Sequence, residues 1–310
     1  MEKKAWMAGL HPASKLILTI IVAFSCTLVM IFIGFLVAIP FMGISPMEFL
    51  SGEINLMDPD HLNLGRYMQI ISHLGMFIFP SFIMAWLLAR KTGTYLYMDR
   101  FPRAEVYLLS VFLIFAAVPF INYTIELNMQ MKLPDFLSQA EEWMRRSEEN
   151  AERMTRVFLN VNTLSALLFN LFMIAVIPAL GEEFMFRGVL LRIFGEWTRS
   201  GHLAVWITAI IFSAIHLQFF GFFPRLILGV LFGYMVLWSG SIWPAVVAHF
   251  INNAAAVTFY FFFHNQLIDD SWEKMGKGPE GIWLAAISVM ITLMLMWGIK
   301  KMSPAKAKAV

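Results

Sequence analysis

The chain has 310 residues, of which 59% are hydrophobic and 14% are charged, whereas about 25% of the residues of a typical soluble domain are charged. A soluble protein of this size needs a larger charged surface, so we expect the excess of Phe, Leu, Ile and Met to face lipid or other membrane helices. The formal net charge of +2 comes from scattered basic residues. It gives no indication of nucleic acid as a partner, and it is typical of loop charges that orient membrane spans.

Eight apolar stretches are long enough, or nearly so, to cross a hydrocarbon core of about 30 Å as helices that rise 1.5 Å per residue. They predict an all-α integral membrane protein with about eight transmembrane helices in one bundle, and one domain over residues 1–310. The first stretch is too long for the apolar part of a signal peptide and no small-residue cleavage motif follows it, so we expect a retained span. The stretches lie near residues 16–40, 66–89, 104–123, 160–196, 203–219, 223–239, 242–263 and 280–299.

The fourth stretch, 160–196, is too long for a simple crossing. It contains Pro178 and Gly181, so we expect one kinked or tilted helix rather than two crossings. The fifth and sixth stretches are short, and we expect them to pack inside the bundle or to tilt little.

Charge predicts the orientation of the chain. With eight spans both termini lie on one side of the membrane, and 14 of the 23 Lys and Arg residues fall on that side. Because cytoplasmic loops carry such an excess, both termini are predicted to be cytoplasmic. The opposite side includes residues 124–158, a segment with Pro134, Trp143 and many Glu and Arg residues. We expect it to form an amphipathic helix outside the membrane, which acts either as a solvated cap or as a substrate gate.

Three charged residues, Glu182, Glu183 and Arg187, interrupt the fourth span in a sequence that is apolar on both sides. Each charge at the centre of a membrane helix costs about 2.5 to 3.5 kcal/mol on insertion scales, which suggests a functional use. Glu183 and Arg187 are four residues apart and can pair on one helix face. Glu182 points about 100° away. It is left without a cation of its own, so in a dry site it is suited to act as a general base. The alternative is that the group marks a membrane boundary.

Two further polar patterns lie in the later spans. Phe212-x-x-x-His216 falls in the fifth, and His249-x-x-x-Asn253 places two hydrogen-bonding side chains on one face of the seventh. Their alternative roles are interfacial placement and interhelical packing. Counted from the predicted boundaries, both histidines and Glu182 lie within the hydrocarbon slab. His73 is an isolated polar residue in the second span, and we assign it no role.

Such a set of residues can hydrolyse a peptide bond. Glu182 with His216 can hold and deprotonate a water molecule, while His249 and Asn253 can donate hydrogen bonds to the oxyanion that forms. The chain has neither an H-E-x-x-H nor a G-x-S-x-G motif, and no Ser, Cys or Asp completes a conventional triad.

The three motifs, Glu182-Glu183-x-x-x-Arg187-Gly188, Phe212-x-x-x-His216 and His249-x-x-x-Asn253, resemble in order and spacing those of the CPBP family. This family contains the type II CAAX prenyl endopeptidases and their bacterial, bacteriocin-processing relatives, also called Abi proteins. The resemblance is good over residues 160–265, which we take as the catalytic core.

The resemblance implies a CAAX-protease-like eight-helix fold and a glutamate-dependent endopeptidase in the cell membrane of a bacterium. It implies Glu182 as the base, His216 as its partner on the water, and His249 with Asn253 as the oxyanion site, with Glu183 and Arg187 in support. Its implied partners are a membrane-associated peptide or protein substrate and the lipid bilayer. It does not name the substrate, because prenylated CAAX substrates belong to the eukaryotic members.

Three alternatives stay open at this point. Glu182, His216 and His249 could bind zinc as a two-histidine, one-carboxylate site, although we favour a site without a cofactor because no residue is evident that would orient zinc ligands. A membrane transporter also places ionisable residues at the midplane, but the chain lacks paired broken helices in two halves. A non-catalytic bacteriocin self-immunity protein could keep the same polar core.

Overall fold

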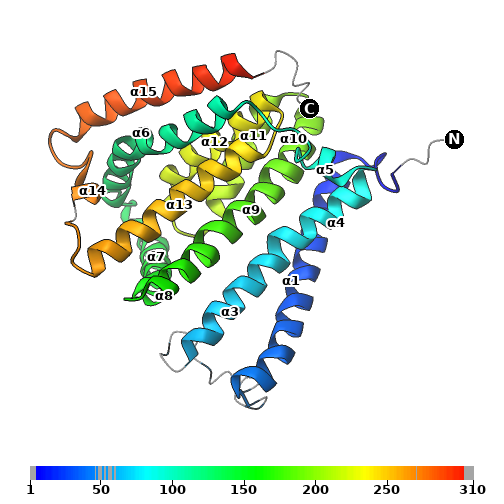
Figure 1. Cartoon of the computed structure of the whole chain (residues 1–310), viewed down its shortest axis with the longest axis horizontal. Helices are drawn as coiled ribbons and strands as arrows, with labels where there is room; N and C mark the ends of the chain where they lie inside the picture. The colour runs from blue at the N-terminus through cyan, green and yellow to red at the C-terminus, as the bar shows by residue number, and fades with distance from the viewer. Residues whose placement is uncertain are drawn as a thin grey trace.

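The structure of the chain is a computed structural model that describes residues 5–45, 61–269 and 271–303, together with positions 47, 51, 54 and 58. In these residues every regular element is a helix (Figure 1). Seven described helices are long and apolar enough to cross a membrane, and an eighth apolar helix, Gly201–Ala214, has 14 residues. At 1.5 Å per residue it rises only about 21 Å. The predicted all-α membrane bundle is confirmed, and its fifth span is a short helix.

The helical spans lie close to the eight predicted stretches. Two of them are continuous helices that contain π-helical turns: Leu62–Leu88 joins α3 (Leu62–His73), η2 (Leu74–Ile78) and α4 (Phe79–Leu88), and Leu164–Thr198 joins α8 (Leu164–Asn170), η4 (Leu171–Val176), α9 (Ile177–Glu183), η5 (Phe184–Leu190) and α10 (Leu191–Thr198). The other spans are α1 (Pro12–Met42), α6 (Ala104–Met129), α11 (Gly201–Ala214), α12 (Phe222–Ser239), α13 (Trp243–His264) and α15 (Gly281–Met302). Four short or peripheral elements are α5 (Thr92–Tyr95), η3 (Asp135–Leu137), α7 (Ser138–Leu159) and α14 (Ser271–Lys274).

Local sequence signals separate helices that hydropathy alone would merge. The Ser200 hydroxyl accepts a hydrogen bond from the backbone N–H of Leu203 at 3.3 Å and starts α11 directly after α10. Gly240 takes a left-handed conformation, with φ of 65°, and ends α12 just before α13. Thr163 caps the start of α8 by accepting from Ala166. The later spans are therefore distinct helices joined by tight turns.

The helix pair formed by α1 and Leu62–Leu88 extends as an arm beside the other helices, as Figure 1 shows. Glycines allow its two helices to approach closely. A Cβ atom on Gly75 would lie 2.9 Å from the backbone Cα of Thr27, and one on Gly34 would lie 2.7 Å from the Ile71 side chain. Close backbone approach through small residues is a main source of helix association in lipid. The long helix Leu164–Thr198 packs against both the arm and the remaining helices.

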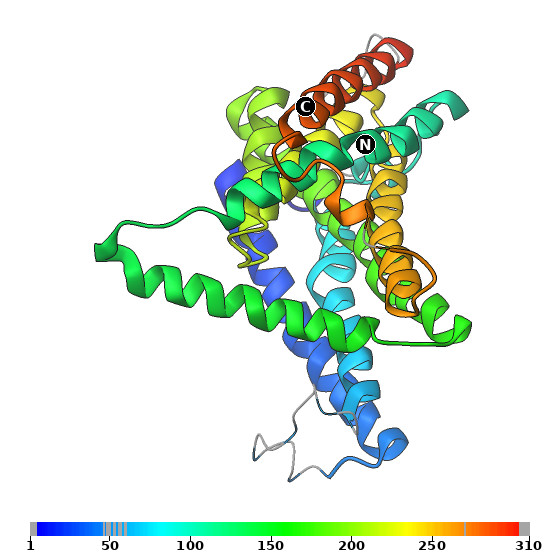
Figure 2. The same ribbon diagram turned by 90° about the vertical axis from the view of Figure 1, so that its left-hand side faces the viewer.

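Helix α7 lies across the ends of the bundle helices α8 and α13 and packs against both (Figure 2). Helix α6 continues to Met129, so it forms the first part of the segment 124–158, and α7 forms most of the rest. Its exposed face carries ion pairs one turn apart, such as Arg156 with Glu152 at 2.8 Å. The backbone N–H of Leu133 and the Arg145 guanidinium hold the pKa of Glu141 below its usual value.

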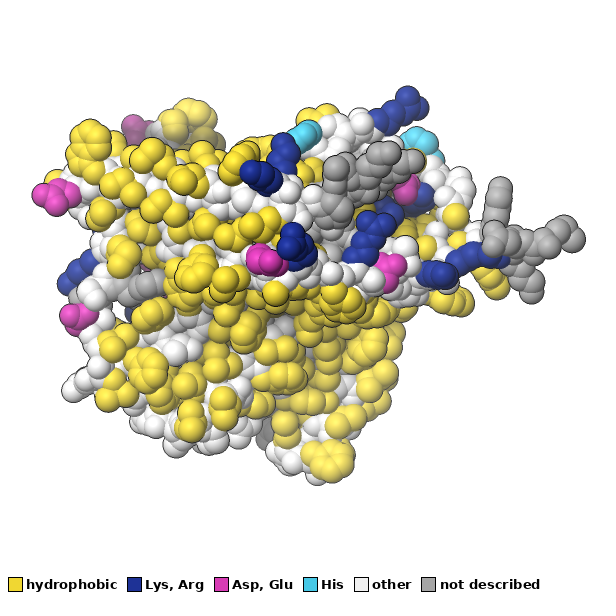
Figure 3. All heavy atoms as spheres, turned by 45° about the horizontal axis from the view of Figure 1, so that its top comes forward, with side chains coloured by type: hydrophobic (Ala, Val, Ile, Leu, Met, Phe, Trp, Pro, Cys, Tyr) yellow, Lys and Arg dark blue, Asp and Glu magenta, His cyan; other side chains and the backbone are white. Residues whose placement is uncertain are grey.

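Both ends of the described chain lie at the same end of the bundle (Figure 1), as an even number of crossings requires. Figure 3 shows Lys and Arg side chains gathered at the upper rim above a broad apolar surface. Arg187, which the sequence analysis counted with the basic residues of this side, is instead 1% exposed inside the bundle. The basic residues of the count that lie outside the described residues are Lys3, Lys4, Lys306 and Lys308.

We predict that Gly75→Ala destabilises the protein by about 1–3 kcal/mol, because the added Cβ overpacks the contact between the arm helices. Thermal unfolding in detergent micelles measures the effect. Gly93→Ala is the matched control, since a Cβ at Gly93 would meet no atom within 4 Å. Equal melting temperatures for the two variants would contradict the close packing of the arm.

Candidate functional site

The centre of the candidate site is the long helix Leu164–Thr198. Its α-helical segment α9 carries Glu182 and Glu183 at its last two positions, and π-helical turns precede and follow it. A π turn accommodates an extra residue and is frequent at functional sites. Pro178 stands at the second position of α9, where its missing N–H would break a regular α-helix. The predicted single long helix is thus present, with irregular turns on both sides of the glutamates.

Asn253 of α13 contacts this irregular region rather than the space in front of Glu182. Its side-chain N–H donates to the carbonyl of Ile174 at 3.1 Å. In an α-helix that carbonyl would bond to the N–H of residue 178, which is a proline and has none. Asn253 therefore donates where Pro178 has no N–H to offer, and its own Oδ1 accepts from Asn252 at 3.1 Å.

Glu183 and Arg187 form the ion pair that their spacing predicts. Arg187 Nη1 donates to Glu183 Oε1 at 2.8 Å, and the side chains of the two residues are 1% and 0% exposed. Arg187 Nη2 donates to the carbonyl of Gly229 on α12 at 3.0 Å. The guanidinium carbon also lies 4.8 Å from the centre of the Phe212 ring, in a cation–π arrangement. The pair fastens the long helix to α11 and α12.

His249 reaches the same carboxylate from α13. Its Nδ1 lies 2.8 Å from Glu183 Oε1. Because a carboxylate accepts hydrogen bonds, Nδ1 is the donor, and this contact fixes the orientation of the ring. The other nitrogen, Nε2, lies 3.7 Å from Glu182 Oε2. Glu183 therefore positions His249 against Glu182.

Glu182 points away from Glu183, as helix geometry predicts, and its carboxylate lies between two imidazoles. Oε2 faces His249, and Oε1 lies 3.5 Å from Nε2 of His73. The side chains of Glu182 and His73 are 9% and 12% exposed. These distances exceed those of direct hydrogen bonds, although catalytic contacts often tighten only when substrate binds.

His73 is a member of the site to which its sequence pattern gave no role. It is the last residue of α3, directly before the π-helical turn η2. The close packing of Gly181 on the arm brings it to the site, since a Cβ on Gly181 would lie 3.1 Å from Phe77 and 3.4 Å from His73. In the sequence, the one sign that His73 belongs to a site is that it is a polar residue in an apolar span.

His216 lies two residues beyond the end of α11. Its Nδ1 donates to the carbonyl of Phe212 at 2.7 Å, because a carbonyl oxygen accepts hydrogen bonds. In the neutral ring Nε2 then has a lone pair and no proton. His216 is therefore able to accept a proton or a hydrogen bond from a group in front of it.

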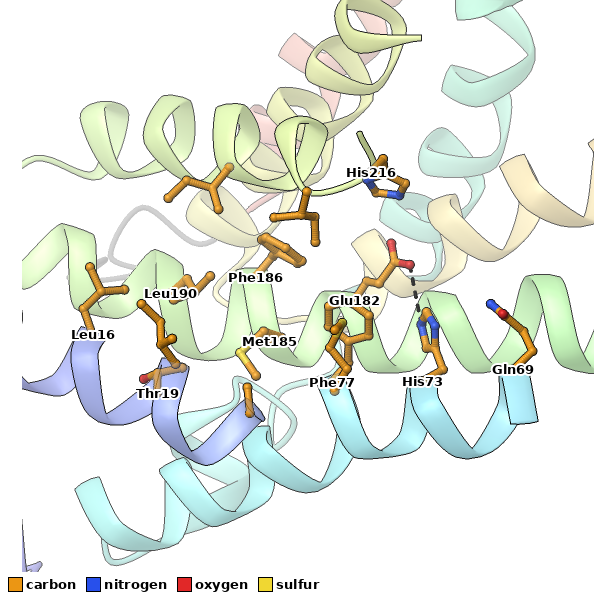
Figure 4. A pocket seen from close by; sticks show the side chains of 15 residues that line it. Leu16, Thr19, Gln69, His73, Phe77, Glu182, Met185, Phe186, Leu190 and His216 are labelled. Carbon is orange, nitrogen blue, oxygen red and sulfur yellow. Dashed lines mark ion pairs between the residues drawn. The ribbon is translucent and has the colours of Figure 1, made fainter. Parts of the chain in front are cut away.

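A cavity of about 550 Å³ is lined by His73, Glu182 and His216, whereas His249 lies behind Glu182 and does not line it. Figure 4 shows Glu182 between His216 on one side and His73 on the other, with Gln69 nearby. The opposite end of the cavity is lined by apolar side chains from α1, η5 and α11: Leu16, Ile20, Met185, Leu190 and Ile211. The cavity thus has a polar end that contains the carboxylate and an apolar end that can accommodate a hydrocarbon group.

The structure brings most of the predicted residues together. Glu182 and His249 are within 3.7 Å of each other, and Glu182 and His216 line one cavity. Asn253 does not line this cavity and instead contacts the backbone of the long helix.

The arrangement does not fit the alternative zinc site of Glu182, His216 and His249. Among the residues that the structure describes, no three His, Cys, Asp or Glu side chains are grouped in a way that could hold a metal ion. The bond from His249 Nδ1 to Glu183 is of the kind that orients a histidine ligand, so Glu183 is the orienting residue that was not evident from the sequence, and the misfit rests on the lack of a group of three ligands. We therefore derive no step of the reaction through a metal.

The fold and the site define a multi-pass membrane protein with a carboxylate and imidazoles buried within its helices. The model of one protein family, described as type II CAAX prenyl endopeptidase Rce1-like, matches residues 164–255. This segment contains Glu182, His216, His249 and Asn253. Over these residues the chain is similar to the CAAX-type intramembrane proteases of the CPBP family, in agreement with the three motifs.

A curated relative also matches part of the chain. It is the uncharacterized protein YpbD of Bacillus subtilis (strain 168), which is 28% identical over 95 residues. The match covers 29% of this chain and 46% of YpbD, so it spans less than half of the relative's own length. No solved structure matches the chain.

We predict that Glu183→Gln destabilises the protein by about 3–5 kcal/mol, because Arg187 is left as a buried charge without its partner. Glu182→Gln is the matched control. It makes the same chemical change at the adjacent residue, whose carboxylate faces the cavity and has no guanidinium partner at ion-pair distance. Thermal unfolding in detergent compares the two, and a larger loss for Glu182→Gln would contradict this account of the ion pair.

Proposed function

We propose that this chain is an intramembrane endopeptidase that hydrolyses a peptide bond in a membrane-associated peptide or protein, with Glu182 as the general base. The observation that carries the proposal is the position of the Glu182 carboxylate. It is buried at the polar end of the cavity, and its neighbours at ion-pair distance are imidazoles, whereas Glu183 is neutralised by Arg187. The similarity of residues 164–255 to a family of CAAX-type proteases supports the same proposal.

In the proposed reaction a water molecule is held at the polar end of the cavity by Glu182 and His216. Glu182 takes one proton from the water as the water oxygen bonds to the carbonyl carbon of the substrate. The carbonyl double bond becomes a single bond to an oxyanion. When the carbonyl re-forms, the C–N bond breaks and the amine leaves with the proton from Glu182. General base and acid catalysis of this kind contributes about 10²- to 10⁴-fold to a rate.

We assign the oxyanion contact to His249. Its Nδ1–H is used by Glu183, so donation from Nε2 requires a ring that carries a proton on both nitrogens. Asn253 was predicted to share this role. Its amide contact with Ile174 supports a positioning role instead, because it holds the helix turn that precedes the glutamates.

His73 is a further member of the proposed site. Its Nε2 faces Oε1 of Glu182 across the cavity, and a donor there would hold the carboxylate toward the water. A hydrogen bond to a charged group contributes about 1.5–3 kcal/mol. His73 thus acts on the base from the arm, opposite to His216.

The proposed substrate enters from the bilayer. The apolar end of the cavity suits a hydrocarbon group beside the scissile bond, and its lining comes from membrane helices. We place the protein in the cell membrane of a bacterium with both termini in the cytoplasm, on the strength of the excess of Lys and Arg near that end of the bundle.

We predict that Glu182→Gln and His216→Ala each lower substrate cleavage by at least about 10²-fold while the proteins remain folded. The measurement compares peptide termini by proteomics in cells that carry wild type or Glu182→Gln. Termini that appear only with wild type identify the substrate, and a synthetic peptide that spans the cleavage site then gives kcat and KM for purified protein.

Equal cleavage by wild type and Glu182→Gln would contradict the proposed mechanism. Flux of a solute into proteoliposomes without any cleavage would favour a transporter, and biological activity that survives in Glu182→Gln would favour a non-catalytic immunity protein. Loss of cleavage with phenanthroline, restored by zinc, would overturn the metal-free form of the reaction.

We predict that His73→Leu lowers kcat by about 10- to 100-fold with little change in KM, because the base loses a donor. His73→Gln, which keeps an N–H donor on a side chain of similar reach, should recover part of the loss. Ser72→Ala is the control, since Ser72 is the residue before His73, does not line the cavity, and its exposed hydroxyl bonds to the backbone carbonyl of Gln69. A wild-type kcat for His73→Leu would remove His73 from the site.

A further inference from the structure

His216 is carried by the loop between α11 and α12, residues 215–221, and not by a helix. α11 ends at Ala214, and Leu217 adopts a left-handed conformation with φ of 54°. A residue with a branched side chain pays a conformational cost in that region. The loop therefore needs contacts from elsewhere to keep one conformation, and the position of the His216 ring depends on them.

Three of these hydrogen bonds come from neighbouring membrane helices. The side-chain N–H of Asn128, near the end of α6, donates to the carbonyls of Phe219 and Phe220 at 3.2 and 2.6 Å. Arg225 in the first turn of α12 donates to the carbonyl of Gln218 at 3.1 Å. Asn128 and Arg225 thus donate to backbone carbonyls of the loop. An unpaired carbonyl that is buried away from water would cost free energy comparable to a lost hydrogen bond.

The remaining contacts come from α7, the helix that crosses the end of the bundle. Glu148 accepts from the backbone N–H of Phe220 at 3.2 Å and from the side-chain amide of Gln218 at 3.3 Å. The hydroxyl of the adjacent Ser147 donates to the carbonyl of Leu217 at 2.8 Å. Two consecutive residues of α7 thus bond to three residues of a loop some 70 positions further along the chain.

Gln218 links α7 to α12. Its amide nitrogen donates to Glu148, and its amide oxygen accepts from Arg225 at 2.7 Å. The result is a chain of hydrogen bonds from the carboxylate to the guanidinium that passes through the second residue after His216. Rings reinforce it: the guanidinium of Arg145 lies over Phe220 at 4.8 Å, and Trp143 lies 5.2 Å from Phe219.

We propose that α7 is a clamp that positions His216, with Glu148, Gln218 and Arg225 as positioning residues. The inference rests on the proposed function, because it assigns His216 to the water. It gives the segment 124–158 a role beyond that of a solvated cap. Contacts at Leu217 and at the three residues after it hold the loop, and with the bond of His216 Nδ1 to the carbonyl of Phe212 they set the direction in which Nε2 faces the cavity.

The clamp itself is tested without reference to activity. Amide hydrogen exchange of the full-length protein in detergent measures the protection of residues 217–221. Glu148→Ala should raise the exchange of these amides, above all that of Phe220, whose N–H donates to Glu148. Glu149→Ala is the matched control, since it removes the same charge from the exposed next residue of α7 and should leave the loop unchanged.

A second variant, in the loop itself, tests the contact between Arg225 and Gln218. A Cβ atom on Gly221 would collide with the Arg225 guanidinium, while the φ of −92° at Gly221 suits alanine. Gly221→Ala should therefore displace Arg225 from Gln218 and raise exchange at the same amides. Gly93→Ala, where the new Cβ meets nothing within 4 Å, is its control.

Enzyme kinetics complete the test. They use the peptide that wild type cleaves and that Glu182→Gln does not cleave. Glu148→Ala and Gly221→Ala should each lower kcat by about 10-fold, as expected for the loss of 1–2 hydrogen bonds, with KM nearly unchanged. Glu148→Gln, which keeps one acceptor oxygen, should recover part of the rate. Faster exchange with a wild-type kcat would overturn the positioning role alone, and unchanged exchange in both variants would overturn the clamp. Equal cleavage by Glu182→Gln would instead contradict the proposed function.

Discussion

The buried pair of Glu183 and Arg187 is the interaction on which the rest of the site depends. Two opposite charges inside a membrane bundle are tolerated only when each is neutralised and hydrogen-bonded. Arg187 meets this condition by bonding to Glu183 and to the carbonyl of Gly229. Glu183, once neutralised, holds Nδ1 of His249. The long helix, α12 and α13 are thereby fixed relative to one another, and Glu182, the adjacent residue, is directed toward the cavity.

Hydropathy and helical spacing were sufficient to predict the spans and the ion pair. Burial in lipid requires long apolar helices, and a spacing of four residues places Glu183 and Arg187 on one face. The same geometry predicted that Glu182 points elsewhere. These inferences concern single helices, where the distance along the chain determines the distance in space.

The parts that could not be predicted depend on contacts between helices. His73 has no partner at helical spacing, and only the packing of Gly181 on the arm places it near Glu182. The link from Asn253 to Ile174 requires knowledge that α13 lies beside the turn disrupted by Pro178. The π-helical turns leave no mark on hydropathy, because the same apolar residues suit an α-helix and a π-helix. Helix α11 ends at Ala214, where the loop that bonds to α7 begins, and that contact too joins distant segments of the chain.

The arm formed by α1 and Leu62–Leu88 gives the site two mechanically different halves. Arg187, Glu183 and His249 belong to helices that hydrogen bonds and charge link together, whereas His73 belongs to the arm and lies 3.5 Å from Glu182, beyond the length of a direct hydrogen bond. A small rotation of the arm would change the separation of His73 and Glu182 and the width of the cavity at once. It would leave the charge cluster undisturbed. A substrate that wedges between α1 and α11 would therefore alter the surroundings of the base by its own bulk.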